Sequence, residues 1–416
     1  MTKPSHSQKP LTIMLVAGEP SGDALGGQVI EALKSISDRP IKVVGVGGEH
    51  MRAAGLHSLF SLDDTSVMGL REVVPRIPKI LQRVREAADL AVRMQPDVAV
   101  MIDSPDFTHR VARRIRRLAP DVRLANYVAP QVWASRPARA RKMAKYFDHV
   151  LCLLPFEVPF FEKNGLAATF VGHPAIERAP PPGQGVAFRA RHGISEAQKV
   201  LVLLPGSRLS EVRFLWDVFR EAVEQTEQRT GPLTIVVPTV PTVARRVREV
   251  AAAWRPSILV IEDSKEKWAA FDAANVALAA SGTVSTELAL ASTPMVIGYR
   301  VGALTAAIAR PLVTLPDHIT LVNLILDRRA IPEFLQENCT AENLSRELLS
   351  LLTNPAARTA QVVASGEAIK ALGRGEERPS VRAARAIFAL ATAPREEGDK
   401  QIKQVPKPSV KLPTGT

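Results

Sequence analysis

Short apolar segments alternate with longer amphipathic ones along most of this chain, and this alternation limits the possible folds more than any other feature. The apolar segments are rich in Val, Ile and Leu and stay apolar at successive positions. Strands that are apolar on both sides are typical of a parallel sheet covered by helices on both faces. In the first half we expect such strands at residues 11–17, 41–46, 98–102, 124–128, 150–154 and 169–171.

A second series of strands follows a break in the pattern at residues 179–185. This break contains three prolines and two glycines, which can continue neither a helix nor a strand. Beyond it we expect strands at residues 200–204, 233–237, 258–261, 276–280 and 295–298. The sequence therefore predicts an α/β protein of two doubly wound, Rossmann-like domains with a cleft between them.

The length supports the same division, because 416 residues exceed what one hydrophobic core usually serves. We expect the first domain at residues 10–180 and the second at residues 186–345. The pattern after residue 300 is mostly helical. The segment 394–416 is rich in Lys, Pro and Gly, which is typical of a disordered tail.

Composition excludes several classes of protein. The two cysteines, Cys152 and Cys339, are too few for a disulfide framework or a Cys-based metal site. The first ten residues carry no apolar signal segment. No run approaches the roughly 18 uninterrupted apolar residues of a membrane span. We therefore expect a cytoplasmic protein that is soluble or peripheral to a membrane.

Basic residues are concentrated in the first half. The net charge is +12, and the segment 71–145 holds 17 Lys and Arg against 7 Asp and Glu. Such a surface suits nucleic acid, anionic lipid or a phosphorylated substrate, and it could also be a solvated helix face. Because aromatic residues make up only 5% of the chain and no nucleic-acid-binding motif accompanies the charge, we expect no nucleic-acid partner.

A strand-turn-helix junction at residues 203–212 predicts a phosphate site. Gly206 and Ser207 form a tight turn after the strand, and Arg208 precedes the helix. Free backbone N–H groups, the positive end of the helix and a guanidinium fork would meet there, which suits a diphosphate.

A second junction of this kind lies downstream. Ser281, Gly282 and Thr283 follow an apolar strand, and Glu287 stands one turn inside the next helix, where it could accept hydrogen bonds from ribose hydroxyls. Two such turns in one half of the chain predict a nucleotide site.

Missing motifs narrow the chemistry. No glycine fingerprint of a dinucleotide-binding dehydrogenase and no P-loop is present, which disfavours dehydrogenases, kinases and ATPases. No Asp-x-Asp follows a strand end, and the eight histidines show no metal-ligand spacing. We therefore expect an enzyme without metal or cofactor, which neutralises a diphosphate leaving group with Arg208, backbone N–H groups and helix dipoles.

The facing domain should supply its groups from loops at the carboxyl ends of strands. In the loop after the first strand, we expect Gly22 to permit a tight turn and Asp23 to cap the following helix, with Glu19 and Ser21 beside them. The alternative is an ordinary well-capped turn, because Ser and Asp are also common capping residues.

A second loop of this kind begins at Asp103, which ends a fully apolar strand. A carboxylate partly removed from water there suits a general base. The alternative is that Asp103 is an N-cap, although Asp106 could fill that role equally well.

Apolar residues between 67 and 84 recur at helical spacing among basic ones and predict a membrane-surface face. The alternative is an amphipathic helix packed on the sheet, and Pro75 and Pro78 make a continuous helix doubtful at its start. The face would include Val67, Met68, Leu70, Val73, Arg76 and Lys79.

Several motifs, taken together and in order, resemble those of the lipid-A-disaccharide synthase family. They are GEPSGD at 18–23, VMG at 67–69, IDSPDF at 102–107, LPFE at 154–157, VGHP at 171–174, LPGSR at 204–208, SGT at 281–283 with Glu287, and GYR at 298–300. The resemblance implies an inverting GT-B glycosyltransferase. It would join UDP-2,3-diacylglucosamine to 2,3-diacylglucosamine 1-phosphate, release UDP and leave a β(1→6)-linked disaccharide 1-phosphate, a lipid A precursor of a Gram-negative envelope.

The resemblance also implies roles for individual residues. Arg208, Glu287 and Asn323 match nucleotide-side and catalytic positions, and Glu19 and Asp103 match acceptor-side acids. This chain departs from the family pattern at Ser135, where a Trp is common, and at Val322, where a Pro is common.

The resemblance further implies that the helices at residues 346–390 return to the first domain, and in some members reach a partner subunit. A homodimer is therefore expected, and so is a place at the inner face of the inner membrane. Two alternatives remain open at the sequence level: another UDP-sugar enzyme of this fold, such as a UDP-sugar 2-epimerase, or a non-catalytic protein that binds nucleotide sugars.

Overall fold

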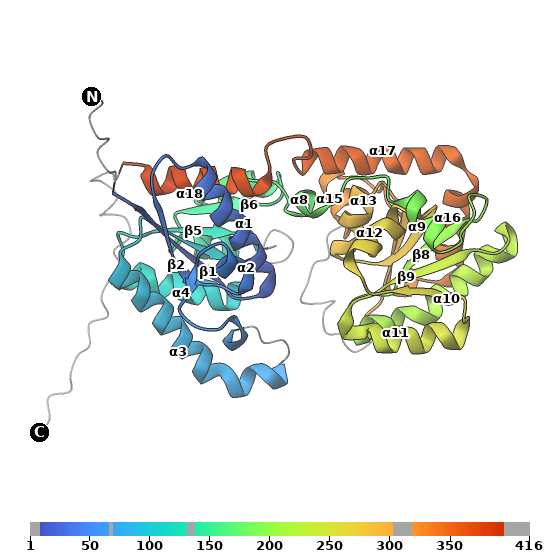
Figure 1. The fold of residues 1–416 in the computed structure, drawn as a ribbon, viewed down its shortest axis with the longest axis horizontal. Helices are drawn as coiled ribbons and strands as arrows, with labels where there is room; N and C mark the ends of the chain where they lie inside the picture. Colours follow the sequence, from blue (N-terminus) through green and yellow to red (C-terminus); the bar gives the residue numbers. More distant parts are fainter. Residues whose placement is uncertain (1–8, 66–69, 131–137, 303–317, 395–416) are drawn as a thin grey trace, which may run out of the picture.

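Two parallel β-sheets covered by helices form the protein (Figure 1). The computed structural model describes residues 9–65, 70–130, 138–302 and 318–394, with the side chains of 70–76 outside that description. The first sheet has seven strands in the order β3-β2-β1-β4-β5-β6-β7, and the second has six in the order β10-β9-β8-β11-β12-β13. The described residues confirm the predicted α/β class with two doubly wound sheets.

The first sheet contains every strand that the sequence predicted for it, with limits that differ by no more than two residues. Its strands are β1 Leu11–Ala17, β2 Ile41–Val46, β3 His57–Ser58, β4 Val98–Ile102, β5 Arg123–Tyr127, β6 His149–Cys152 and β7 Ala167–Phe170. The prediction lacked β3, because two residues are too few to form a periodic pattern. The helices are α1 Pro20–Ile36, α2 Glu49–Ala53, α3 Leu70–Met94, α4 Pro105–Leu118, α6 Ala138–Met143, α7 Glu157–Lys163 and α8 Ala175–Arg178, and a 3₁₀ turn spans Leu62–Asp64.

The second sheet follows the same plan. Its strands are β8 Val200–Leu204, β9 Thr234–Pro238, β10 Leu259–Ile261, β11 Val276–Ala280, β12 Met295–Tyr299 and β13 Glu333–Leu335. The prediction missed β13, which lies in the segment expected to be mostly helical. The helices are α9 Gly185–Arg191, α10 Leu209–Thr230, α11 Pro241–Trp254, α12 Ser264–Ala273, α13 Thr283–Leu290, α15 Leu321–Leu326, α16 Ala341–Thr353, α17 Pro355–Ala371 and α18 Pro379–Thr392, and a 3₁₀ turn spans Gln336–Asn338.

Each sheet is buried on both faces, which explains the uninterrupted apolar strands. In β1, Met14 and Val16 belong to the apolar cluster on one face, whereas Ile13 and Leu15 belong to the cluster on the other. All four side chains are fully buried. Successive side chains of a strand point to opposite faces, so a strand covered on both sides must be apolar at every position.

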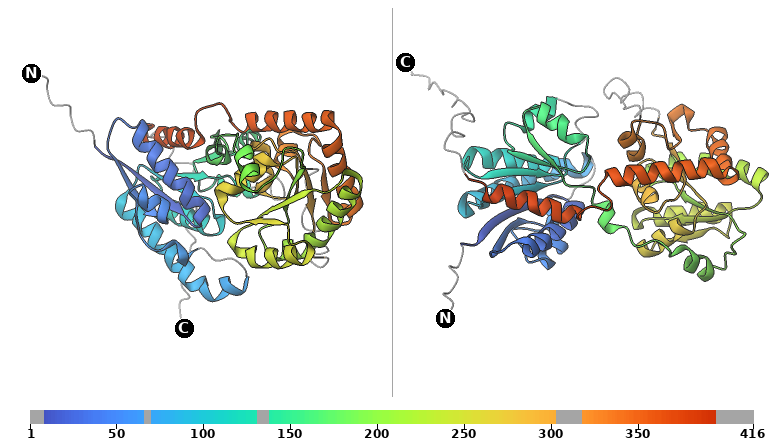
Figure 2. Two further views of the ribbon diagram at one scale, coloured as in Figure 1. Left: turned by 45° about the vertical axis from the view of Figure 1, so that its right-hand side comes forward. Right: turned by 90° about the horizontal axis from the view of Figure 1, so that it is seen from above.

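The C-terminal helices divide between the two halves. Helix α17 lies along the second half and α18 along the first (Figure 2). Ala368 and Ile369 of α17 are buried in a cluster of the second sheet, while Ala384 and Ile387 of α18 are buried with residues of α1 and β1. The prediction that the helices of 346–390 pack on the first domain is therefore right for α18 and wrong for α17. The other predicted domain limits stay predictions, and the tail at 395–416 lies outside the described residues.

Helix α3 begins at Leu70 and runs through both prolines that made a continuous helix doubtful. Val84, Ala87, Ala88 and Ala91 are buried against the first sheet, so the later turns of α3 match the alternative of a packed amphipathic helix. Of the predicted membrane face, Val67 and Met68 lie outside the described residues, as do the side chains of Leu70, Val73 and Arg76. In the part of the chain that the structure describes, no helix is both long and apolar enough to span a bilayer.

The docking of α18 can be tested by truncating Ile387, whose side chain is fully buried. We expect Ile387→Ala to lower the free energy of unfolding by about 2 to 5 kcal/mol, because the change leaves a cavity between α18 and the first half. Urea denaturation followed by circular dichroism measures the loss. The control is Val363→Ala on α17, where the side chain is 63% exposed and the change should stay within about 0.5 kcal/mol. Equal stability of both variants would show that α18 does not dock in solution.

Candidate active site

The carboxyl edge of the first sheet brings the two predicted acids together. Strands β1 and β4 are paired in parallel, with Ala17 opposite Ile102, so the loops that follow them leave the sheet side by side. The Ser21 hydroxyl donates to Asp103 Oδ2 at 2.9 Å, and the Ser104 hydroxyl donates to Glu19 Oε1 at 3.2 Å. Each acid thus accepts a hydrogen bond from a serine of the segment that carries the other acid, and Glu19, Ser21 and Asp103 lie together at this edge.

The backbone at Asp103 is strained. Asp103 and Ser104 have φ angles of 53° and 45°, a left-handed region that residues other than glycine seldom adopt. The Asp103 N–H donates to the carbonyl of Tyr127, and the Ser104 N–H donates to Asp103 Oδ1. Strain of this kind persists only where the surroundings impose it, and it is concentrated at functional sites. It fixes where the half-buried Asp103 carboxylate lies.

A third strained residue lies at the same edge. Val128 follows β5 with a φ of 73°, which is unfavourable for a β-branched side chain. The side-chain amide of Asn126 donates to the Val128 carbonyl at 3.0 Å. Sequence reasoning missed Val128, because nothing in a single valine indicates its backbone conformation.

Neither acid after β4 is the N-cap of α4. The helix begins at Pro105, and Ser104 occupies the N-cap position without a capping side-chain hydrogen bond. Asp106 lies in the first turn and is exposed. The capping alternative for Asp103 is therefore not supported, and Asp106 stays a predicted cleft residue.

Gly22 serves close packing rather than a tight turn. It lies inside α1, which already begins at Pro20, so the turn expected at this glycine was wrong. A Cβ atom at Gly22 would stand 3.0 Å from the Ile102 carbonyl oxygen. Glycine lets the first turn of α1 approach β4, which keeps Ser21 within reach of Asp103.

Asp23 caps a different helix from the one expected. Its side chain is 4% exposed and accepts hydrogen bonds from the N–H groups of Gly48, His50 and Met51, at the start of α2. His50 Nδ1 lies 3.2 Å from Asp23 Oδ2. With its oxygens engaged in these contacts, Asp23 is part of the fold. The prediction that it caps α1 was wrong, and a contact with an acceptor stays a prediction.

The turn at Gly206 follows the strand as predicted, but two of its backbone N–H groups already have a hydrogen-bond partner. Gly206 has a φ of 116°, and Arg208 stands before α10 with its side chain 72% exposed. The N–H groups of Ser207 and Arg208 both donate to Glu211 Oε2, at 2.9 and 3.2 Å. The expectation that these N–H groups are free for a phosphate was therefore wrong, because they donate to a carboxylate in the first turn of α10.

The turn at Gly282 is more open. Gly282 has a φ of 148° and precedes α13, and a Cβ atom placed on it would have no heavy atom within 4 Å. Gly282 and Thr283 are exposed and Ser281 is half-buried. The start of α13 is thus accessible to an anion, as the sequence predicted.

Glu287 has a partner that the sequence did not indicate. Both of its carboxylate oxygens lie 2.9 Å from Lys267 Nζ on α12. The two side chains are about one quarter exposed, so the pair lies at the surface beside the Gly282 turn. A separation of 20 positions in the sequence hides this contact from sequence patterns, and a contact of Glu287 with ribose stays a prediction.

Asn323, a predicted catalytic residue, is engaged within the fold. Its side chain is fully buried, its amide nitrogen donates to the carbonyl of Ile331 and to Glu333, and its oxygen accepts from the N–H groups of Ala330 and Ile331. All of its hydrogen-bonding groups are therefore used within the fold. Asn323 supports the loop before β13, and its predicted catalytic role stays a prediction.

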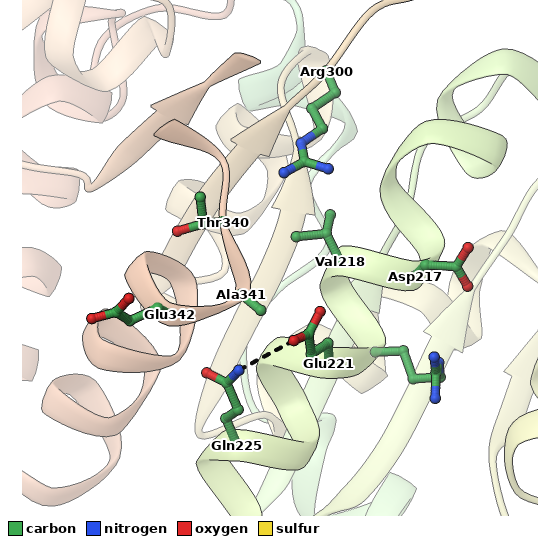
Figure 3. A pocket seen from close by; sticks show the side chains of 9 residues that line it. Asp217, Val218, Glu221, Gln225, Arg300, Thr340, Ala341 and Glu342 are labelled. Atoms are coloured by element: carbon green, nitrogen blue, oxygen red, sulfur yellow. Dashed lines mark hydrogen bonds between the residues drawn. The ribbon is translucent and has the colours of Figure 1, made fainter. Parts of the chain in front are cut away.

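A pocket of about 500 Å³ lies between α10 and α16 (Figure 3). Asp217, Glu221 and Glu342 line it together with Arg220 and Arg300. Arg300 donates to the carbonyl of Cys339. None of the predicted donor or acceptor residues lines this pocket, and its charges are of both signs, so we place the candidate site at the sheet edges instead.

Within the described residues, no group of three or more His, Cys, Asp or Glu side chains is arranged to hold a metal ion.

The fold and the turns at the second sheet define a GT-B-like protein. Solved structures of that architecture are similar over most of their length at low identity. A UDP-GlcNAc 2-epimerase from Neisseria meningitidis bound to UDP-GlcNAc has a TM-score of 0.56 at 11% identity, covering 91% of this chain and 98% of that one. An apo structure of OtsA has a TM-score of 0.58 at 10% identity, covering 93% and 100%.

Sequence comparison is more specific. The family model for lipid-A-disaccharide synthetase matches residues 13–388. The lipid-A-disaccharide synthase of Rhodospirillum centenum is 46% identical over 92% of this chain and 96% of its own length, and that of Paramagnetospirillum magneticum is 43% identical over 93% and 99%. The chain belongs to the lipid-A-disaccharide synthase family and is a glycosyltransferase.

The structural role of Asp23 predicts a pH dependence. Burial raises the pKa of this carboxyl, but the hydrogen bonds from Met51, His50 and Gly48 lower it below its ordinary value of 3.8. A lowered pKa stabilises the fold above the unfolded value, and this stabilisation is lost as pH falls through the folded value. We expect Asp23→Asn to cost about 1 to 3 kcal/mol of unfolding free energy at pH 7.

The difference between Asp23→Asn and the parent should shrink as the pH is lowered below about 3.8, and urea denaturation at a series of pH values measures it. Asp38→Asn, a change at an exposed position, is the control and should have little effect at any pH. A difference that stays constant down to pH 2 would rule out the proposed charge on Asp23.

Proposed function

We propose that the protein transfers 2,3-diacylglucosamine from its UDP conjugate to 2,3-diacylglucosamine 1-phosphate, with inversion at the anomeric carbon and without a metal ion. The family assignment supports a donor and an acceptor of these classes. The observation that carries the chemistry is the pair of serine-held carboxylates, Glu19 and Asp103, at the edge of the first sheet. In open α/β sheets, ligands bind outside the carboxyl ends of the strands.

The reaction consists of one proton transfer and one displacement. Asp103 takes the proton of the acceptor 6-hydroxyl while that oxygen attacks the anomeric carbon of the donor. The bond from this carbon to the diphosphate breaks, and UDP leaves with the electron pair. The Arg208 guanidinium and the exposed start of α13 at Gly282 stabilise the charge that develops on the diphosphate.

Asp103 is the better candidate for the base because its position is imposed by the backbone. Its φ of 53° and its hydrogen bonds from Ser21 and Ser104 hold the carboxylate in one place. A general base must lie within hydrogen-bond reach of the proton that it removes. Glu19 is the alternative base, because it lies on the adjoining loop and is held by Ser104.

Substitution of the acids separates these roles. We expect Asp103→Asn to lower kcat by about 10² to 10⁴-fold, because the carboxamide cannot accept the proton, while donor affinity stays unchanged. Steady-state kinetics with both lipid substrates and calorimetry with UDP measure the two quantities. Glu19→Gln is the matched variant and should reduce kcat less. Full activity of Asp103→Asn together with an inactive Glu19→Gln would transfer the role of base to Glu19.

The acylated substrates require access to a membrane, and we propose an anionic bilayer as the partner of the first half. Ile77 and Leu81 of α3 are 43% and 39% exposed. The neighbouring helix α4 adds exposed Arg110, Arg113 and Arg117. Apolar side chains beside basic ones are typical of a surface that lies in the headgroup region. Lys79 contributes less than predicted, because Asp64 pairs with it.

Vesicle sedimentation tests this surface. We expect the parent protein to sediment with vesicles of phosphatidylglycerol and less with vesicles of phosphatidylcholine. The double variant Ile77→Ser, Leu81→Ser should bind about ten-fold or more weakly, because two apolar side chains no longer enter the bilayer. The matched control carries Val186→Ser and Val363→Ser, two exposed valines of the second half. Loss of binding in the control alone, or binding that ignores lipid charge and salt, would contradict the proposal.

We also propose that the protein works at the inner face of the inner membrane, where its acylated substrates would be embedded. A homodimer remains a proposal from the family resemblance.

A further inference from the structure

The Gly206 turn is built around the carboxylate of Glu211, and we propose that Glu211 is a positioning residue that aims the Arg208 guanidinium at the leaving diphosphate. This inference rests on the proposed function, because it assumes that Arg208 meets a UDP-linked donor. It adds to that function a residue that neither the sequence motifs nor the catalytic scheme used.

The fit between the turn and the carboxylate is close. Glu211 is 8% exposed and lies in the first turn of α10. A Cβ atom at Gly206 would come within 2.5 Å of both Glu211 Cβ and Glu211 Oε2. Only glycine therefore lets the chain wrap around this side chain, and the φ of 116° at Gly206 adds the same requirement.

The carboxylate divides its oxygens between backbone and side chain. Oε2 accepts from the N–H groups of Ser207 and Arg208, and Oε1 accepts from Arg208 Nη1 at 2.8 Å. The Arg208 side chain is nevertheless 72% exposed. One corner of the guanidinium is thus fixed, and much of the group still faces solvent. A guanidinium has five N–H donors, so the contact with Glu211 leaves donors that can bind a phosphate.

This arrangement reduces the number of backbone N–H donors that the turn can offer a diphosphate. The N–H groups of Ser207 and Arg208 already donate to a carboxylate in the first turn of α10. At this turn, the neutralisation of the leaving group then depends on the Arg208 side chain. A long exposed side chain loses rotamer freedom when it binds, and Glu211 removes part of that freedom beforehand.

The competing interpretation is that Glu211 only closes the start of α10. That role would affect stability without distinguishing one ligand from another. A positioning role predicts that the effect of Glu211 depends on the phosphates of the ligand and on the presence of Arg208.

The experiment uses the full chain and measures UDP and uridine binding by isothermal titration calorimetry. We expect Glu211→Gln to weaken UDP binding about ten-fold, as for loss of a hydrogen bond to a charged group, and to leave uridine binding unchanged. Glu211→Asp keeps the charge but withdraws it by one methylene, and it should weaken UDP binding similarly. This second variant serves if Glu211→Gln melts below the assay temperature.

A double-mutant cycle with Arg208→Ala completes the design. Because Glu211 acts through Arg208, adding Glu211→Gln to Arg208→Ala should change UDP affinity by less than two-fold. The matched control is Glu227→Gln on the same helix. Glu227 also pairs with an arginine, Arg255, and accepts a backbone N–H, that of Leu233, and its substitution should leave UDP affinity unchanged.

Some results would overturn the role of Glu211 alone, and others would overturn the proposed function as well. UDP binding that survives in both Glu211 variants, equal losses for UDP and uridine, or additive losses in the cycle would each overturn the role of Glu211 while leaving the proposed function in place. Parent protein that binds neither UDP nor the donor would overturn the proposed function and this inference with it.

Discussion

The parallel pairing of β1 with β4 is the contact on which the rest of the site depends. The register that sets Ala17 opposite Ile102 makes two loops, 82 residues apart at Ser21 and Asp103, leave the sheet together. Their close approach requires small residues, since a Cβ atom at Gly18 would come within 2.6 Å of the Ser104 side chain. The crossed serine hydrogen bonds then hold both carboxylates. The geometry of this candidate site is a consequence of sheet register.

The charged side chains at the carboxyl edges of the two sheets have different kinds of partner. On the first sheet, carboxylates are held by neutral donors and stay accessible. On the second, two side chains expected to meet the nucleotide already have partners within the protein: Arg208 with Glu211 and Glu287 with Lys267. Such pairs fix the direction of long side chains before a ligand arrives, which reduces the entropy lost on binding. The exposed turn at Gly282 is the part of this edge that remains open.

Sequence patterns predicted the strands well because burial on both faces requires apolar residues at every position. The pattern predicted β1, β2, β4, β8 and β11 with their observed limits. It missed β3 and β13, which have two and three residues and lie at the edges of the sheets. The family resemblance, not the pattern, placed α17 on the first half, whereas Ala368 and Ile369 of α17 are buried in a cluster of the second sheet.

Predictions about single polar residues depended on what lies nearby in space. The position of Glu19 and Asp103 at the edge of the first sheet was predictable, since both follow apolar strands of a parallel sheet. Asp23 and Asn323 have the residue types of a site, yet both are buried and engaged within the fold. Glu211 and Lys267 were missed for the opposite reason, because a charged residue on a helix is ordinary until its partner is known.

Product analysis tests the account most directly. Purified protein would be incubated with UDP-2,3-diacylglucosamine and 2,3-diacylglucosamine 1-phosphate, and the products followed by mass spectrometry and NMR. The account predicts one UDP released for each acylated disaccharide 1-phosphate formed, with a β(1→6) linkage. An α linkage, or donor consumed without any disaccharide, would contradict it.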